Sequence, residues 1–573
     1  MDPTKSTSWR QQAGMEPLMV RETSSFALYE GHGNGPAVFA EVPSIVVELA
    51  WRKFLCSISP NAEFLRKVHA SRQITFDSPT SLHSRSGGIP SLRIDNTEES
   101  QEIETVTEVK RVYYLDWTRI LAIYLVITFH CVQALDFIQL WKEPKTLAVQ
   151  SFRACALQVG MPLFFHISGR AQALGKHQDG ICTVTWQRVL RLLVPFIVCY
   201  ILLIPPYQFI HKKDEAGVPR NLLDFELQYL QPKYFLDNFD PAWLWFLPVL
   251  FIVTVVSLPL LNFAEAASFS NCAINLVVWL GLAAVFRTQL GFTWPFVLLM
   301  LLIPVVPVVT VGFVPLPAQA DGDTSSSVKN AAMKQWLAIR ISTFSYVFLS
   351  VLLVCNMKYT DLNPIGRFIP GVLLYMMFYI QGYFIVRWSS RIVHAFDSGS
   401  QDHSPEDVRI LQSYTKYIRF YQLIVAGLVL IIIFASSPVS TGAHKVWEDD
   451  LGDAPFFPIY SASRFDDPTF AALHVLGTWA WLAFAISLAQ SYLDNDIDPI
   501  IYKHATSSTM VVYLFHWMFI KFYAFYFVRD LHLMDGWWQF FQLPLTFAVG
   551  LAGSLSVYRA FLHCKCLGRL FGL

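Results

Sequence analysis

Two ionisable residues, Arg119 and His130, lie inside an apolar stretch, YYLDWTRILAIYLVITFHCVQALDF (residues 113–137), that otherwise suits a membrane-spanning helix. In an α-helix, their separation of eleven residues turns the second side chain to within roughly 20° of the first, about 16 Å further along the axis. Ionisable side chains at membrane depth are costly and normally face a bundle interior or an aqueous cavity. The spacing therefore predicts a polar path along one face of one helix.

Each residue of this pair also has a purely structural interpretation. Arg119 could be an interfacial anchor whose guanidinium extends towards the cytosol, and His130 could be hydrogen-bonded to a neighbouring helix. Asp116 lies three residues before Arg119, so the two can pair on adjacent turns and Asp116 can orient the guanidinium.

The next apolar stretch ends in MPLFFHISGRAQALG (residues 161–175). Ser168 and Gly169 predict close backbone contact between membrane helices, a common packing device. His166 has two interpretations, as a catalytic group and as a hydrogen-bonded partner of another helix.

Two arginines and a further histidine extend this set of costly residues. Arg188 and Arg191 lie one turn apart in WQRVLRLLVPF. They match ordinary positive charge on the cytosolic side, but two guanidiniums on one face also suit a polyphosphate ligand. His516 lies within YLFHWMF, where a lone histidine would be a packing residue. The stretch PAWLWFLPVL (residues 241–250) is typical of an aromatic belt at the outer interface.

The elements that position these residues are predicted to be membrane helices. The chain of 573 residues is 54% hydrophobic and 15% charged, a balance typical of a polytopic membrane protein. The prediction is an all-α bundle of about 10–12 transmembrane helices. The twelve predicted spans are 115–138, 151–174, 186–210, 242–263, 272–289, 292–314, 336–357, 366–388, 415–438, 470–490, 506–528 and 538–560.

The domain prediction separates a partly disordered cytosolic extension, residues 1–110, from a membrane domain, residues 111–573. Lysine and arginine in the short loops favour an orientation with both termini in the cytosol. The zero formal net charge argues against a nucleic-acid partner. No CxxC or HExxH string suggests a metal site.

The motifs together resemble the membrane-bound acyltransferase 3 family, and within it the branch that contains glucan-biosynthesis protein C, a glucan succinyltransferase. The resemblance covers roughly residues 113–560. It rests on five stretches in family order: LDWTRILAIYLVITFH, MPLFFHISG, RVLRLLVPF, WLWFLPVL and YLFHWMF. One departure is His166, which replaces the third aromatic of the family's FFF-x-x-SG motif. The other is that the N-terminal extension, and two of the twelve predicted spans, have no counterpart in the family's ten-helix core.

The resemblance implies transfer of an acyl group from cytosolic acyl-CoA, such as acetyl-CoA or succinyl-CoA, to a hydroxyl of a sugar, glycan or lipid. Arg119 and His130 match the family's basic residue, ten residues, then histidine. His130 would be the general base or a covalent acyl carrier, and His516 would bind the acceptor or stabilise the oxyanion. Arg119, Arg188 and Arg191 would hold the CoA phosphates. Membrane lipids are expected partners, and a homo-oligomer is compatible with the sequence.

Two other classes stay open at this point. A secondary transporter or channel would also carry histidine and arginine on a proton or substrate pathway, although no repeated half is visible in the sequence. A scaffold or receptor would use the same groups only for packing. Binding of acyl-CoA distinguishes the enzyme, since both alternatives predict none.

Overall fold

The chain divides into two units, residues 1–106 and 107–573, and every described residue belongs to the second. The computed structural model describes residues 112–138, 147–175, 181–212, 221–229, 231, 241–265, 269–289, 292–313, 324–356, 364–397, several positions from 420 to 431, 468–494, 499–531, 538–564, 568 and 571. The predicted N-terminal extension lies outside these ranges.

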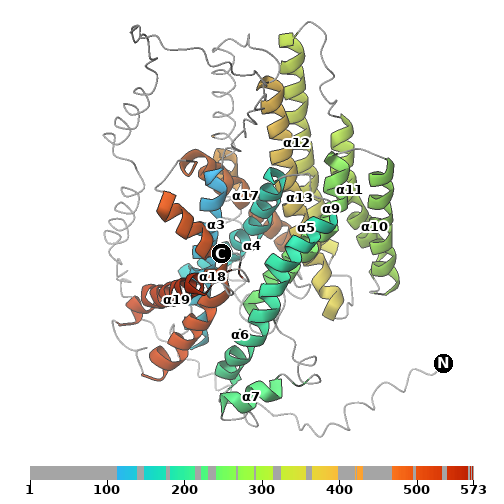
Figure 1. Ribbon diagram of the computed structural model, residues 1–573. Coiled ribbons are helices and arrows are strands. Elements are labelled where there is room, and N and C mark those ends of the chain that lie inside the picture. Colours follow the sequence, from blue (N-terminus) through green and yellow to red (C-terminus); the bar gives the residue numbers. More distant parts are fainter. Residues whose placement is uncertain are drawn as a thin grey trace, which may run out of the picture. The chain divides into compact units, whose positions relative to one another are not determined.

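The described chain is all-helical, as the sequence predicts (Figure 1). Its long helices are α3 (Tyr113–Phe137), α4 (Leu147–Leu174), α6 (Val194–Lys212), α9 (Phe246–Glu265), α10 (Phe269–Thr288), α11 (Trp294–Phe313), α12 (Thr324–Asn356), α13 (Pro364–Asp397), α17 (Pro468–Tyr492), α18 (Pro499–Phe522) and α19 (Gln539–His563). The shorter helices are α5 (Ile181–Arg188) and α7 (Leu222–Tyr229), the 3₁₀ turn η2 (Ala242–Trp245), and the π-helical segments η1 (Val189–Leu193) and η5 (Tyr523–Arg529).

The described helices include seven that are long and apolar enough to cross a membrane and three shorter apolar ones. Eleven of the twelve predicted spans coincide with described helices, and the remaining one, 415–438, lies mostly outside the described residues. The structure therefore supports a multi-pass membrane protein, with seven candidate spans in the described part of the chain.

Helices α4 and α13 pack against each other with their backbones close together. A Cβ atom added at Gly169 would lie 1.9 Å from the carbonyl oxygen of Tyr379, and one added at Gly382 would lie 2.1 Å from the carbonyl oxygen of His166. The backbones can approach this closely only because both glycines lack a side chain. The predicted role of Gly169 in close packing is confirmed.

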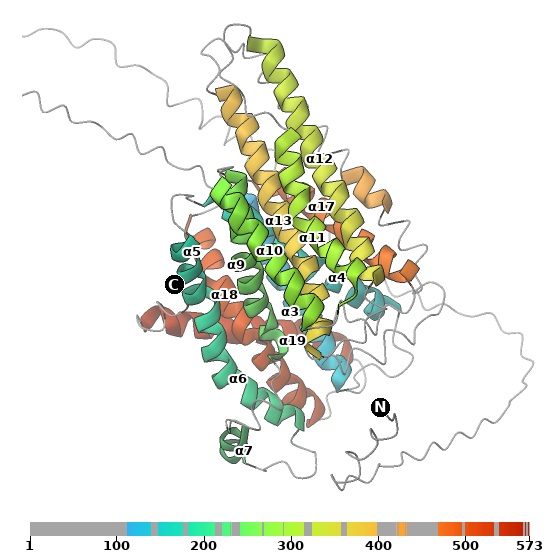
Figure 2. The ribbon, with the colours of Figure 1, turned by 90° about the vertical axis from the view of Figure 1, so that its right-hand side faces the viewer.

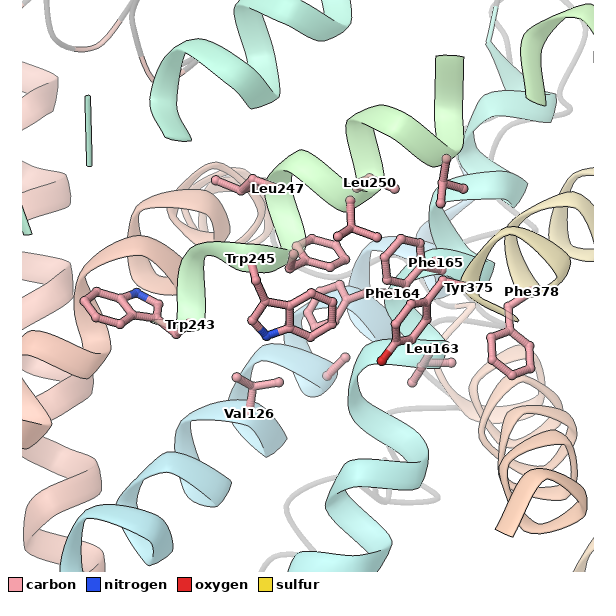
Figure 3. Packing of buried hydrophobic residues seen from close by; sticks show 14 of the residues in the cluster. Val126, Leu163, Phe164, Phe165, Trp243, Trp245, Leu247, Leu250, Tyr375 and Phe378 are labelled. Carbon is pink, nitrogen blue, oxygen red and sulfur yellow. The ribbon is translucent and has the colours of Figure 1, made fainter. Parts of the chain in front are cut away.

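Aromatic packing joins this pair to the start of α9. The ring of Phe165 on α4 stacks on Tyr375 of α13 with centroids 4.4 Å apart, and Trp245 of η2 lies 5.7 Å from the same tyrosine (Figure 3). Helix α3 packs on α4 and on α18, and α18 packs on α19. Helices α12 and α13 run side by side in both views (Figures 1 and 2). The resulting core holds α3 and α18 against each other.

Candidate functional site

Helix α3 carries the first predicted pair. It is one uninterrupted α-helix, Tyr113–Phe137, with Asp116 and Arg119 in its first two turns and His130 two turns before its end. Because the helix is continuous, the two residues keep the predicted separation of about 16 Å and the shared face.

A hydrogen-bonded group of Asp116, Arg119 and Tyr502 lies near the N-terminus of α3, which we call the arginine end. Arg119 Nη1 donates to Asp116 Oδ1 at 3.4 Å, and the two side chains are 35% and 19% exposed. The hydroxyl of Tyr502 on α18 donates to the other carboxylate oxygen of Asp116. Asp116 is thus held by two helices, so it can fix the direction of the Arg119 guanidinium.

Arg188 joins this group, whereas Arg191 is exposed. Arg188 is half-buried, donates to Gln172 Oε1 of α4, and interacts electrostatically with Arg119. Arg191 lies within the π-helical segment η1, Val189–Leu193. A π-helix has more residues per turn than an α-helix, so this segment turns Arg191 away from the direction that α-helical spacing would give it.

The other end of α3 meets α18. The ring centroid of His130 lies 5.2 Å from that of His516 and 4.4 Å from that of Trp517. Lys521 Nζ lies 5.2 Å from the Trp517 ring centroid and 5.6 Å from that of Tyr207 on α6. We call these five residues the histidine site. The fold brings the two predicted histidines, which are distant in sequence, into ring contact.

Hydrogen bonds indicate which ring nitrogens can accept a proton. His516 Nδ1 lies 3.0 Å from the carbonyl oxygen of Val512, which only accepts, so Nδ1 carries the hydrogen. His516 is fully buried, and its Nε2 has no hydrogen-bond partner among the described residues. Nδ1 of the half-buried His130 faces Gln133 Oε1 at 3.1 Å. Because the Gln133 oxygen only accepts, His130 Nδ1 carries the hydrogen. In their neutral forms, both His130 and His516 therefore have an acceptor at Nε2.

His166 lies in a separate network on α4. Its Nδ1 lies 3.1 Å from the carbonyl oxygen of Phe378, and its Nε2 accepts from Arg170 Nε at 3.0 Å. The buried Arg170 also donates to the Tyr114 hydroxyl at 3.1 Å. Both ring nitrogens of His166 are thus engaged, which favours the hydrogen-bonded interpretation. Ser168 is half-buried on the same helix.

The aromatic stretch before α9 does not form the expected interfacial belt. Trp243 is 3% exposed, and its Nε1 donates to the carbonyl oxygen of Leu514 at 2.9 Å. The hydroxyl of Tyr513 donates back to the Trp243 carbonyl oxygen. Ala242 begins the turn with a φ of 43°, a conformation that residues with a side chain rarely adopt. The stretch is instead part of the packing around α18.

Sequence reasoning missed three residues near the histidines: Lys521, Tyr207 and Trp243. A signal for Lys521 was present, because a lysine inside an apolar run is itself a candidate functional residue. Tyr207 carries no such signal, and Trp243, whose ring lies 5.3 Å from that of Tyr207, lies in the family-like stretch WLWFLPVL but was expected only at the membrane interface. Aromatic residues are common throughout the membrane helices, so only their tertiary contacts single them out.

A family model described as an acyltransferase domain, acyltransferase 3, matches residues 112–559. No curated protein and no solved structure matches the chain. Within the described ranges, no three side chains of histidine, cysteine, aspartate or glutamate come together as a metal site. All residues of the arginine end and of the histidine site fall inside the matched region.

Proposed function

The chain belongs to the acyltransferase 3 family, and we propose that it transfers an acyl group from acyl-CoA to a hydroxyl of a glycan or lipid. The observation that carries this proposal is the ring contact between His130 and His516, whose centroids lie 5.2 Å apart. His130 lies on α3, the helix that also carries Arg119. One helix then joins an anion-binding end to a proton-accepting end.

The donor is bound at the arginine end. Arg119 and Arg188 are close enough for their charges to interact, and two guanidiniums with several donors each suit the phosphates of CoA. Asp116 keeps Arg119 directed towards them. This end faces the cytosol in the orientation favoured by the loop charges, where acetyl-CoA or succinyl-CoA is available. The thioester at the end of the CoA arm then reaches towards His130.

His130 acts as the general base of the transfer. Its Nε2 takes the proton of the acceptor hydroxyl, whose oxygen attacks the thioester carbonyl carbon. The carbonyl π electrons move to oxygen and form a tetrahedral oxyanion. The carbonyl re-forms as the C–S bond breaks, and the departing CoA thiolate receives the proton from the imidazolium. His516, with an acceptor at Nε2, positions the acceptor molecule by accepting a hydrogen bond from a second hydroxyl of it.

A covalent carrier mechanism gives a different result in single turnover. If His130 attacked the thioester itself, acyl-CoA without acceptor would release CoA and leave the labelled acyl group on the protein. General-base catalysis predicts no labelled protein and no thiol release until an acceptor is added. Purified protein with acyl-labelled acetyl-CoA, denatured rapidly and separated by size, distinguishes the two.

Transfer itself is tested by mass spectrometry of glycans and lipids from membranes with and without the protein, each supplied with acetyl-CoA or succinyl-CoA. An added acyl mass that requires the protein supports the proposal. A succinyl ester on a glucan would further support the glucan succinyltransferase branch. If the purified protein neither binds nor consumes acyl-CoA, the proposal is wrong and a transport function becomes the better account.

Arg188→Gln should raise the KM for acyl-CoA by about tenfold or more, whereas Arg191→Gln should have a smaller effect. A hydrogen bond to a charged group contributes roughly 1.5–3 kcal/mol, and about 1.4 kcal/mol corresponds to tenfold. Arg188 is close enough to Arg119 for the two charges to interact, while Arg191 is exposed. Filter binding of labelled acyl-CoA to each purified variant checks which substitution weakens binding more. Equal effects would contradict the proposal that the CoA phosphates lie at Arg119 and Arg188.

A further inference from the structure

We propose that Lys521 is a further catalytic residue, whose ammonium stabilises the oxyanion formed when the acceptor hydroxyl attacks the thioester. This inference rests on the proposed acyl transfer. It assigns a role that the histidines and arginines of the site leave unfilled.

The first argument is position. Lys521 is fully buried near the end of α18 and lies four residues after Trp517, so both side chains share one face. The Trp517 ring lies 4.4 Å from that of His130 and 5.2 Å from Lys521 Nζ. Lys521 also interacts electrostatically with His130. The ammonium and the proposed base therefore both lie against the Trp517 ring, within range of an electrostatic interaction.

The second argument is the way in which the charge is held. Lys521 Nζ lies over three aromatic rings, 4.9 Å from Phe525, 5.2 Å from Trp517 and 5.6 Å from Tyr207. A buried cation is costly in a membrane, and desolvated cation–π contacts offset part of that cost. These contacts fix the position of the ammonium among the three rings. A positive charge held in this way can act on a nearby developing anion.

The third argument is that three neighbouring donors, those of Trp243, Tyr513 and His516, are directed at backbone carbonyls. Trp243 Nε1–H donates to Leu514, the Tyr513 hydroxyl donates to Trp243, and His516 Nδ1–H donates to Val512. A neutral His516 can then only accept at Nε2, so it cannot donate to an oxyanion. Lysine provides three N–H donors and a full charge, which suits the stabilisation of an oxyanion.

In the reaction step, the acceptor oxygen bonds to the carbonyl carbon while His130 takes the proton. The carbonyl oxygen becomes negative and accepts a hydrogen bond from the Lys521 ammonium. When the C–S bond breaks, the electron pair returns to the C=O bond and the ammonium keeps all its protons. Because the interaction strengthens only as charge develops, Lys521 lowers the barrier more than it strengthens substrate binding.

The test compares Lys521→Met, which keeps the length and removes the charge, with Lys521→Arg, which keeps a charged donor. We expect Lys521→Met to lower kcat by about 10²–10³-fold with little change in acyl-CoA binding or KM. Lys521→Arg should keep kcat within about tenfold of the wild type, since it retains a charged hydrogen-bond donor. Both are measured on membranes adjusted to equal amounts of inserted protein.

Arg529→Met is the matched control, because Arg529 also lies 4.9 Å from the Phe525 ring but outside the histidine site. It should leave kcat unchanged. Near-wild-type kcat in Lys521→Met, or a raised KM with unchanged kcat, would overturn the proposal. If Lys521→Met fails to insert, Lys521→Arg decides: inserted protein with a larger than tenfold loss of kcat overturns it. Absence of transfer by the wild type would instead refute the proposed function itself.

Discussion

His130→Ala lowers the rate of acyl transfer by about 10²–10⁴-fold, the usual contribution of a positioned general base. His130→Gln shows a similar loss, because an amide fills much of the same space but cannot take the proton. Binding of acyl-CoA is retained in both variants, since the arginine end lies about 16 Å away along α3. Release of free CoA thiol, measured with saturating acyl-CoA and acceptor, gives the rate.

The matched control is His504→Gln, an exposed histidine of the same helix as His516 that lies 3.1 Å from the Tyr558 hydroxyl. This variant keeps the wild-type rate. A His130→Ala protein that is correctly inserted and transfers acyl groups at the wild-type rate would falsify the role of His130. Loss of acyl-CoA binding in the same variant would show instead that His130 affects the donor site.

Gly169→Ala lowers the free energy of unfolding by about 3 kcal/mol or more, at or beyond the upper end of the usual cost of overpacking. The new Cβ would lie 1.9 Å from the carbonyl oxygen of Tyr379 and 2.8 Å from its carbon. Both atoms belong to the backbone of α13, so no side-chain rotation can relieve the clash. The thermal unfolding temperature in detergent, and the amount of protein that reaches the membrane, both fall.

Gly281→Ala on α10 provides the control, since an added Cβ there meets nothing within 4 Å. Alanine is about 0.5–1 kcal/mol more favourable than glycine inside a helix, so this variant is as stable as the wild type or slightly more so. Equal unfolding temperatures for the Gly169→Ala and Gly281→Ala proteins would contradict the close packing of α4 against α13.

The sequence was sufficient for the features that depend on local spacing and composition. Apolar runs of membrane length gave the helical class, because lipid leaves a chain few ways to satisfy its backbone. The eleven-residue spacing of Arg119 and His130 determined their shared face, since α3 is a single uninterrupted helix. Ser168 and Gly169 indicated a close helix contact before its partner was known. The roles of the site residues remain predictions.

The tertiary structure determined which helices and side chains contact each other, since these contacts join segments that are distant in sequence. The burial of Trp243 against α18 was not predictable, because tryptophan suits a membrane interface as well as a core. The π-helical turn after Arg188 changed the direction of Arg191, which α-helical spacing alone could not anticipate. Only the packing of α3 on α18 places His130 beside His516, Trp517 and Lys521. Chain spacing fixes directions along one helix, whereas a site built from several helices needs the contacts between them.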